Sequence, residues 1–148
     1  MGDKMNREIK FKAWDEGNKV MHFGFQFIKS GEEGNNWIVF QSDKQRPFFI
    51  KGMNNPYFQQ QFEIMQYTGL KDKNGVEIYE GDIIAFTLDT VKSDGSYTEM
   101  KHEGFILWEF TAWYVTVIGY GYFRLSHILS NSNIEVVGNI HENSELLK

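Results

Sequence analysis

The stretch "LKDKNGVEIYEGDII", residues 70–84, decides how the second half of the chain folds. Asn74 and Gly75 tolerate the positive φ angles that tight hairpin turns need. A short segment, "VEIY", follows this turn, and "EGD" then redirects the chain into the apolar run "IIAFTL", residues 83–88. Asp82 is expected to cap that second turn by accepting backbone N–H bonds. The stretch therefore predicts a hairpin that leads into a largely buried strand.

Further strand-like segments follow this hairpin. They are "FILWEF" (residues 105–110), "WYVTVIGYGYFRL" (113–125) and "IEVVGNI" (134–140), and the terminal "ENSELL" predicts a short turn or helix. The polar residues 89–104 are either a long loop or an extended hairpin tip around Asp94 and Gly95. From residue 63 onward, this pattern predicts four or five short strands. Their order is typical of a small, strongly bent antiparallel barrel of the SH3-like kind.

The N-terminal part predicts a β-hairpin region, residues 1–62, ahead of a barrel region, residues 63–148. "REIKFKAW" (residues 7–14) alternates as a half-buried strand does. The alternation predicts an apolar face made by Ile9, Phe11 and Ala13. It predicts a polar face made by Glu8, Lys10 and Lys12. "DEGN" is a turn, residues 19–28 return as a second strand, and residues 37–41 form a short one. Residues 42–62 contain both prolines, and a short helix starting at Pro56 and an irregular lead-in to the next strand are equally supported.

Composition narrows the range of functions. The chain has 148 residues, a net charge of -5 and no cysteine, which excludes disulfides, thiolate nucleophiles and cysteine zinc sites. The net negative charge argues against nucleic-acid binding, because that binding depends on Lys and Arg neutralising phosphates. No apolar signal-peptide core and no run of 18 apolar residues occurs, so we expect a cytoplasmic protein that does not enter membranes.

No group of residues points to catalysis. The segment from Asp72 resembles the start of a calcium loop, but Val76 and Ile83 occupy positions where ligands are required. The four histidines, His22, His102, His127 and His141, lack metal-site spacing. "GYGYFR" (residues 119–124) lacks the third glycine of a dinucleotide loop, and no helix is expected after it. The sequence therefore predicts a protein that is not an enzyme, with no catalytic residues, no cofactor and no metal.

Aromatic residues are the one cluster that suggests binding. The chain holds 13 Phe, 7 Tyr and 4 Trp, which is more than a small barrel interior can readily hold. Some should therefore be exposed and should bind a partner or form a homo-oligomer, whereas the alternative is that most of them fill the core. The candidates for this binding or oligomer surface are Trp108, Phe110, Trp113, Tyr114, Tyr120 and Tyr122.

Three blocks of the sequence also resemble a known family. "QYTGLKDKNGVEIYEGDII", the closing "IEVVGNIHENSELL", and "REIKFKAWD" followed by a turn and "KVM" occur in the order found in the YopX family of phage and prophage proteins. The resemblance implies a phage or prophage origin in a bacterial host and a fold that contains a β-barrel, and it brings no catalytic residues. We therefore expect a phage accessory protein that binds a host or phage protein. The alternative is a small-barrel nucleic-acid-binding protein that uses exposed aromatics with Lys92 and Lys101.

Overall fold

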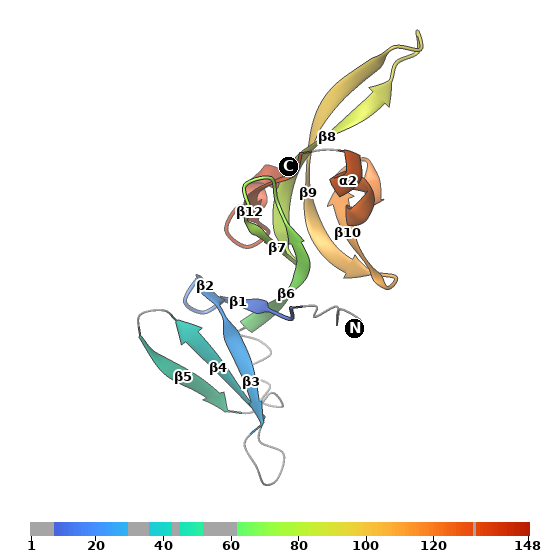
Figure 1. Ribbon diagram of the computed structural model, residues 1–148. Helices are drawn as coiled ribbons and strands as arrows, with labels where there is room; N and C mark the ends of the chain where they lie inside the picture. Colours follow the sequence, from blue (N-terminus) through green and yellow to red (C-terminus); the bar gives the residue numbers. More distant parts are fainter. Residues whose placement is uncertain (1–7, 30–35, 43–44, 52–61, 132) are drawn as a thin grey trace, which may run out of the picture. The chain divides into compact units, whose positions relative to one another are not determined.

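The computed structural model of the protein describes residues 8–29, 36–42, 45–51, 62–131 and 133–148, with the backbone alone described for residues 25–29, 36–42, 45–51 and 131. The chain divides into two compact units, Met1–Tyr67 and Thr68–Lys148. Both units consist mainly of antiparallel strands, and curled sheets form a half-barrel (Figure 1). The mainly β fold class expected from the sequence is confirmed.

The first unit begins with the predicted N-terminal hairpin. β1 (Phe11–Asp15) and β2 (Val20–Phe23) pair antiparallel, and the other edge of β1 pairs with the start of β6 (Phe62–Lys71). Asp15 stabilises the hairpin turn, because its Oδ1 accepts the backbone N–H of Asn18 at 2.9 Å. This bond is the usual way in which an aspartate favours a turn.

Burial along β1 differs from the predicted alternation. Lys12, expected on a solvent face, is only 5% exposed, and Asp15 is buried as well. Ile9, expected on the apolar face, is exposed. The neighbouring residues Ala13 and Trp14 are both buried, so both faces of the strand are covered. A strand covered on both faces does not follow a two-residue polarity period, and the face assignment made from the sequence is therefore wrong.

A three-stranded antiparallel sheet completes the first unit. Its strands are β3 (Phe25–Lys29), β4 (Asn36–Ser42) and β5 (Gln45–Lys51). Gly24, with φ +66°, interrupts the single strand predicted over residues 19–28. β5 was not predicted because it contains Pro47, but β5 lies at the edge of the sheet, where a proline is tolerated. The middle of the predicted loop 29–36 and the helix proposed from Pro56 lie outside the described residues.

The second unit is organised around a five-stranded antiparallel sheet with the strand order β11-β10-β9-β8-β12. These strands are β8 (Asp82–Val91), β9 (Tyr97–Glu109), β10 (Ala112–Val117), β11 (Gly121–Arg124) and β12 (Glu135–Asn139). The prediction of four or five short strands is wrong. Within the described residues, seven strands run from β6 to β12, and β8 and β9 are 10 and 13 residues long. The segment predicted as one strand over residues 113–125 turns at residues 118–120 and forms β10 and β11.

A short helix covers the core side of this sheet. α2 (Leu125–Asn131) directly follows β11, so the expectation that no helix follows "GYGYFR" is wrong. Leu125 and Ile128 are spaced by one helical turn and are fully buried. A helix of 7 residues is too short to be stable alone, so its burial holds it in place. The other buried residues of this core are Ile78, Ile84, Phe86, Ile106, Val115, Val117 and Ile134.

The turn between β6 and β7 (Glu77–Tyr79) forms as the sequence predicted, with Gly75 at φ +83°. Asp72, 7% exposed, organises it: Oδ1 accepts the N–H groups of Asn74 at 2.8 Å and Val76 at 2.9 Å. Its Oδ2 accepts the N–H of Val136 at 3.0 Å, so the same carboxylate joins this turn to β12. One side chain therefore fixes both the hairpin and its attachment to the sheet.

The turn after β7 also matches the prediction. Asp82 Oδ2 accepts the N–H of Tyr79 at 2.8 Å, which is the expected capping bond. Gly81, with φ +76°, provides the sharp change of direction into β8 and donates its N–H to the Ile106 carbonyl at 2.8 Å. The turn-forming residues within 70–84 therefore make two turns, and the second leads into β8 of the central sheet.

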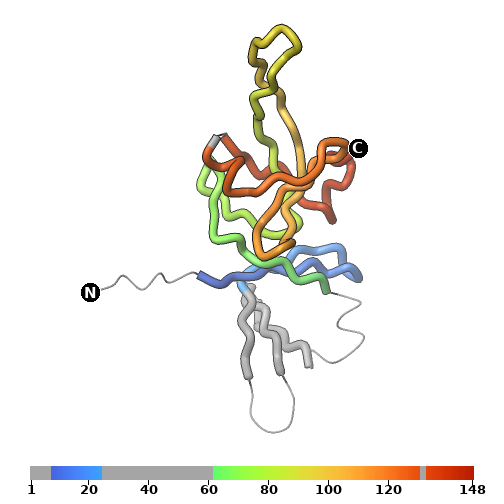
Figure 2. Tube along the Cα trace, turned by 90° about the vertical axis from the view of Figure 1, so that its right-hand side faces the viewer, coloured from blue at the N-terminus to red at the C-terminus, as the bar shows by residue number. Residues whose placement is uncertain are grey.

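β8 and β9 continue beyond the rest of the sheet as a two-stranded hairpin, which we call the arm (residues 87–101; Figures 1 and 2). β12 pairs with β8 only up to Ala85, and β10 pairs with β9 only from Phe105 onward. At the tip, Asp94 Oδ1 accepts the N–H of Ser96 at 2.9 Å. The extended-hairpin alternative for residues 89–104 is therefore confirmed.

Candidate functional site

Four of the six predicted aromatic residues are exposed, whereas Trp113 packs against the core. Phe110 is 78% exposed and Trp108 is 47% exposed, and Tyr120 and Tyr122 are exposed as well. Trp113 and Tyr114 are half-buried. Aromatic side chains of this size are normally covered, so their exposure on one β-hairpin region marks this region as a candidate binding surface.

Strand alternation separates these residues into two groups. Trp108 and Trp113 are cross-strand partners, with their rings edge to face at a centroid distance of 4.9 Å. They lie on the same face of the sheet as Ile106 and Val115, whose side chains belong to the core. The indole pair therefore forms the outer end of the core face.

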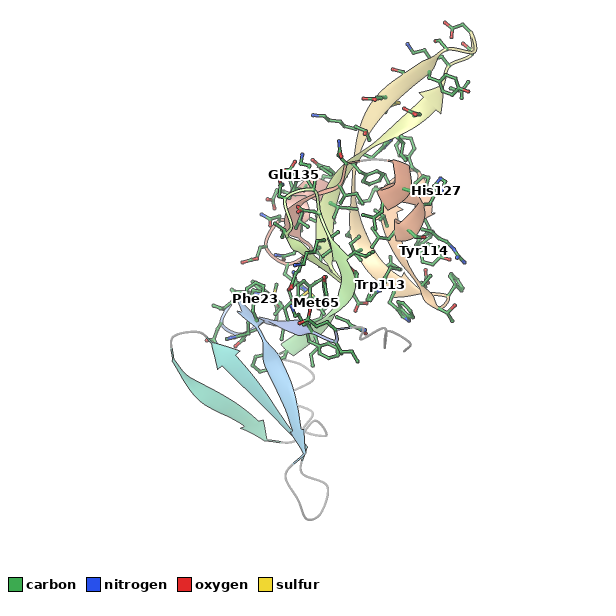
Figure 3. The ribbon with its side chains drawn as sticks, in the orientation of Figure 1. Phe23, Met65, Trp113, Tyr114, His127 and Glu135 are labelled. Carbon is green, nitrogen blue, oxygen red and sulfur yellow. The ribbon has the colours of Figure 1, made fainter. Side chains whose placement is uncertain are left out.

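The second group lies on the opposite face. Phe110 meets Tyr114 edge to face at 6.4 Å, and Arg124, the cross-strand partner of Tyr114, places its guanidinium 5.9 Å from the tyrosine ring centre. Tyr122 lies on this face too, two residues from Arg124. Trp113 and Tyr114 project from adjacent positions of β10 (Figure 3). The β9–β10 turn therefore carries aromatic side chains on both of its faces, and we call Trp108, Phe110, Trp113 and Tyr114 the aromatic tip.

The backbone of this turn is unusual. Phe110 and Thr111 have φ angles of +45° and +69°, the left-handed region that two-residue hairpin turns of the I′ type require at both central positions. Glycine and asparagine are preferred there, whereas a left-handed conformation costs other residues about 1–2 kcal/mol each. The tip therefore places an exposed phenylalanine and a β-branched threonine where smaller residues would be more stable.

Tyr120 lies apart from the aromatic tip, in the turn at the other end of β10. Its ring meets His102 at 4.9 Å, and His102 also lies 5.9 Å from Phe86. His102 and Tyr120 border a groove of about 370 Å³ that we call the β9 groove. It is lined by residues 100–103 of β9, by Ile118 and Tyr120, and by the 3₁₀ helix η1 (Ser144–Leu147).

The carboxylate of Asp72 has a structural role. Burial raises the pKa of Asp72, but the N–H groups of Val136, Val76 and Asn74, together with the charge of Lys73, bring that pKa below its ordinary value. A carboxylate held ionised by backbone donors stabilises a turn and is a poor proton donor. No group of three or more histidine or acidic side chains within the described residues could hold a metal ion.

Comparison with known proteins places the chain in a family. The family model described as YopX protein matches residues 10–148. The chain belongs to the YopX family. Protein EF1440 from Enterococcus faecalis has a similar structure, with 32% sequence identity and a TM-score of 0.57 over 95% of this chain and 99% of that chain. Protein yopX from Bacillus subtilis shares the fold at 19% identity and a TM-score of 0.56, over 94% of this YopX-family chain and 98% of its own.

The family resemblance expected from the three sequence blocks is thus confirmed. A search of curated proteins found no match. None of the helices in the described part of the chain is long and apolar enough to cross a bilayer. The β9 groove was not predicted, because its lining comes from four separate segments of the sequence that carry no common motif.

Proposed function

We propose that this YopX-family protein is a non-enzymatic accessory protein of a phage or prophage and that it acts in the bacterial cytoplasm by binding a host or phage protein. The binding surface is the aromatic tip, which meets the partner through Phe110 and Trp108. The family resemblance supports the phage context, and the exposed aromatics support the binding role.

The observation that carries this proposal is the Phe110–Thr111 turn. A hairpin that only had to reverse direction would be more stable with asparagine and glycine at these positions. Instead, the most exposed aromatic of the tip is held at a strained position in the two-residue turn between β9 and β10. Local strain of this kind clusters at functional sites. Rigid aromatic anchors also account for most of the free energy in many protein interfaces.

The nucleic-acid alternative receives less support from the charges around the surface. Arg124 is next to the tip, but Glu109 precedes the turn directly. Lys101 on the arm is two residues from Glu103, and Lys92 is two residues from Asp94. Binding to phosphates requires an excess of cations, which this surface does not provide. We expect no salt-dependent shift of single- or double-stranded probes in gels, even at low ionic strength.

Affinity capture from a bacterial host lysate tests the proposal. The full chain and two alanine variants, Phe110→Ala and Phe23→Ala, are compared, because both residues are exposed phenylalanines and they lie on different units. A partner identified by mass spectrometry should be captured by the wild type and by Phe23→Ala. With the purified partner, Phe110→Ala should weaken binding about 30-fold, the effect of losing a hot-spot aromatic worth about 2 kcal/mol.

The outcomes separate the alternatives clearly. Equal binding by Phe110→Ala and by the wild type would show that the partner binds elsewhere, and a Trp108→Ala variant with unchanged binding would exclude the aromatic tip altogether. If no partner is captured reproducibly under native conditions, the binding role itself is contradicted.

A further inference from the structure

One edge of the arm is open for strand pairing. β9 pairs with β8 on one side over residues 97–105, whereas β10 pairs on the other side only from Phe105 onward. Among the described residues, no strand therefore pairs with this other side of β9 over residues 97–103. An open strand edge of this length is a ready template for another chain.

The hydrogen-bond pattern shows which groups face outward. Lys92 donates its N–H to the Ser96 carbonyl at 2.8 Å, so Lys92 and Ser96 form a hydrogen-bonded pair. Hydrogen-bonded and non-hydrogen-bonded pairs alternate along an antiparallel ladder, so every second β8–β9 pair counted from this one is also hydrogen-bonded. The backbone groups of Thr98, Met100 and His102 consequently point toward β8. Those of residues 97, 99, 101 and 103 point away from β8, toward the open edge.

We propose that a second copy of this chain pairs antiparallel with this edge, with Glu99 of each copy opposite Lys101 of the other. In this register, Met100 meets Met100 at the two-fold axis, and residues 97–103 form hydrogen bonds between the copies. Two Glu–Lys pairs result from a single symmetric register. Moving the register by two residues in either direction places Glu99 opposite Glu99, or Lys101 opposite Lys101.

The arm itself shows why Glu99 needs this counter-charge. Glu99 and Asp89 are directly opposite one another in the β8–β9 ladder and both are exposed. Like charges in directly opposite positions destabilise a sheet. Lys101 of the second copy would lie on the other side of Glu99 and compensate this repulsion.

The β9 groove lies where the arm of the second copy would end. Glu103, Ile118 and Tyr120 are among the residues that line it. In the proposed register, Tyr97 of the second copy is opposite Glu103. Tyr97 is 74% exposed in the single chain. Each groove would therefore receive an aromatic side chain from the other copy, and each tyrosine would become covered.

Charge-reversal variants test this register. Light scattering at low ionic strength should show that the wild type becomes dimeric as its concentration rises. Glu99→Lys and Lys101→Glu should each weaken the dimer about 30-fold, because each replaces two attractive cross-strand pairs by two repulsive ones. An equimolar mixture of the two variants should dimerise again, because every pair between unlike copies is then of opposite charge. Circular dichroism of each variant should match the wild type, since both side chains are exposed.

Phe110→Ala is the control for the aromatic tip and should dimerise as the wild type does. A wild type with the mass of one chain at all concentrations would overturn the proposal, and so would a mixture of the two variants that stays monomeric. A dimer that is lost in Phe110→Ala but kept in Lys101→Glu would show that the copies meet at the aromatic tip instead.

Discussion

Replacing Asp72 by asparagine should weaken the attachment of the 72–76 turn to β12. Asparagine retains one acceptor oxygen, which can serve the N–H groups of Asn74 and Val76. Its amide group then faces the N–H of Val136, where the carboxylate accepted a hydrogen bond of 3.0 Å. Bonds to a charged acceptor contribute about 1.5–3 kcal/mol, so Asp72→Asn should lower the free energy of unfolding by about 2 kcal/mol. Asp72→Ala, which removes the acceptor of all three bonds, should cost about 4 kcal/mol.

The effect should depend on pH in a defined direction. The folded-state pKa of Asp72 is lowered, so the carboxylate stabilises the fold fully above its unfolded pKa of about 3.9. This contribution is lost as the pH falls through the folded-state pKa. Urea unfolding curves should therefore show the full difference between wild type and Asp72→Asn at neutral pH. The difference should shrink as the pH is lowered below about 4.

Hydrogen exchange provides the local measurement. The Val136 amide should lose protection by roughly 30-fold in Asp72→Asn, which corresponds to about 2 kcal/mol. Asp94→Asn is the matched control, because the hydrogen bonds of Asp94 stay within the exposed tip of the arm and its pKa is also lowered, first by the Ser96 hydroxyl and then by the Ser96 N–H. It should change exchange at the tip alone. Unchanged Val136 exchange in Asp72→Asn, with an unchanged urea midpoint, would refute this account of the turn.

Three other changes test the packing of the second unit. Gly104→Ala should lower the melting temperature and cost about 2–3 kcal/mol in urea unfolding, because an added Cβ would lie 2.6 Å from the Thr116 carbonyl oxygen. The double change Phe110→Asn and Thr111→Gly should raise stability by about 1–2 kcal/mol by relieving the left-handed strain, while it abolishes capture of the partner. Lys73→Met should change the free energy of unfolding by less than about 1 kcal/mol, because its ion pair with a β12 glutamate is largely exposed.

Much of the second unit could be predicted because its turns are local. The "DKNG" turn and the Asp82 cap each depend on residues within a few positions, and both form as expected. α2 was missed because a helix of 7 residues has little intrinsic stability and depends on the burial of Leu125 and Ile128. The buried face of β1 was missed because Lys12 is covered through tertiary packing, which a two-residue period does not encode.

The residues of the candidate site could be predicted from the sequence, but their arrangement could not. The aromatic residues could be selected from composition, but strand alternation and the turn positions decide their grouping. Trp108 meets Trp113 because they are cross-strand partners, whereas Tyr120 is directed to His102 at the other end of β10. The strained φ angles of the Phe110–Thr111 turn had no signal in the sequence, because neither residue prefers them.

The hydrogen bond between Asp72 and Val136 can form on the ribosome only after β12 has been synthesised. Ala85 on β8 is synthesised well before its partner Glu135 on β12. At roughly 5–20 residues per second, the intervening segment of about 50 residues takes about 3–10 s to appear. During that interval the outer edge of β8 is unpaired and one oxygen of Asp72 has no native donor. The nascent chain is therefore prone to aggregation from the synthesis of β8 until β12 emerges.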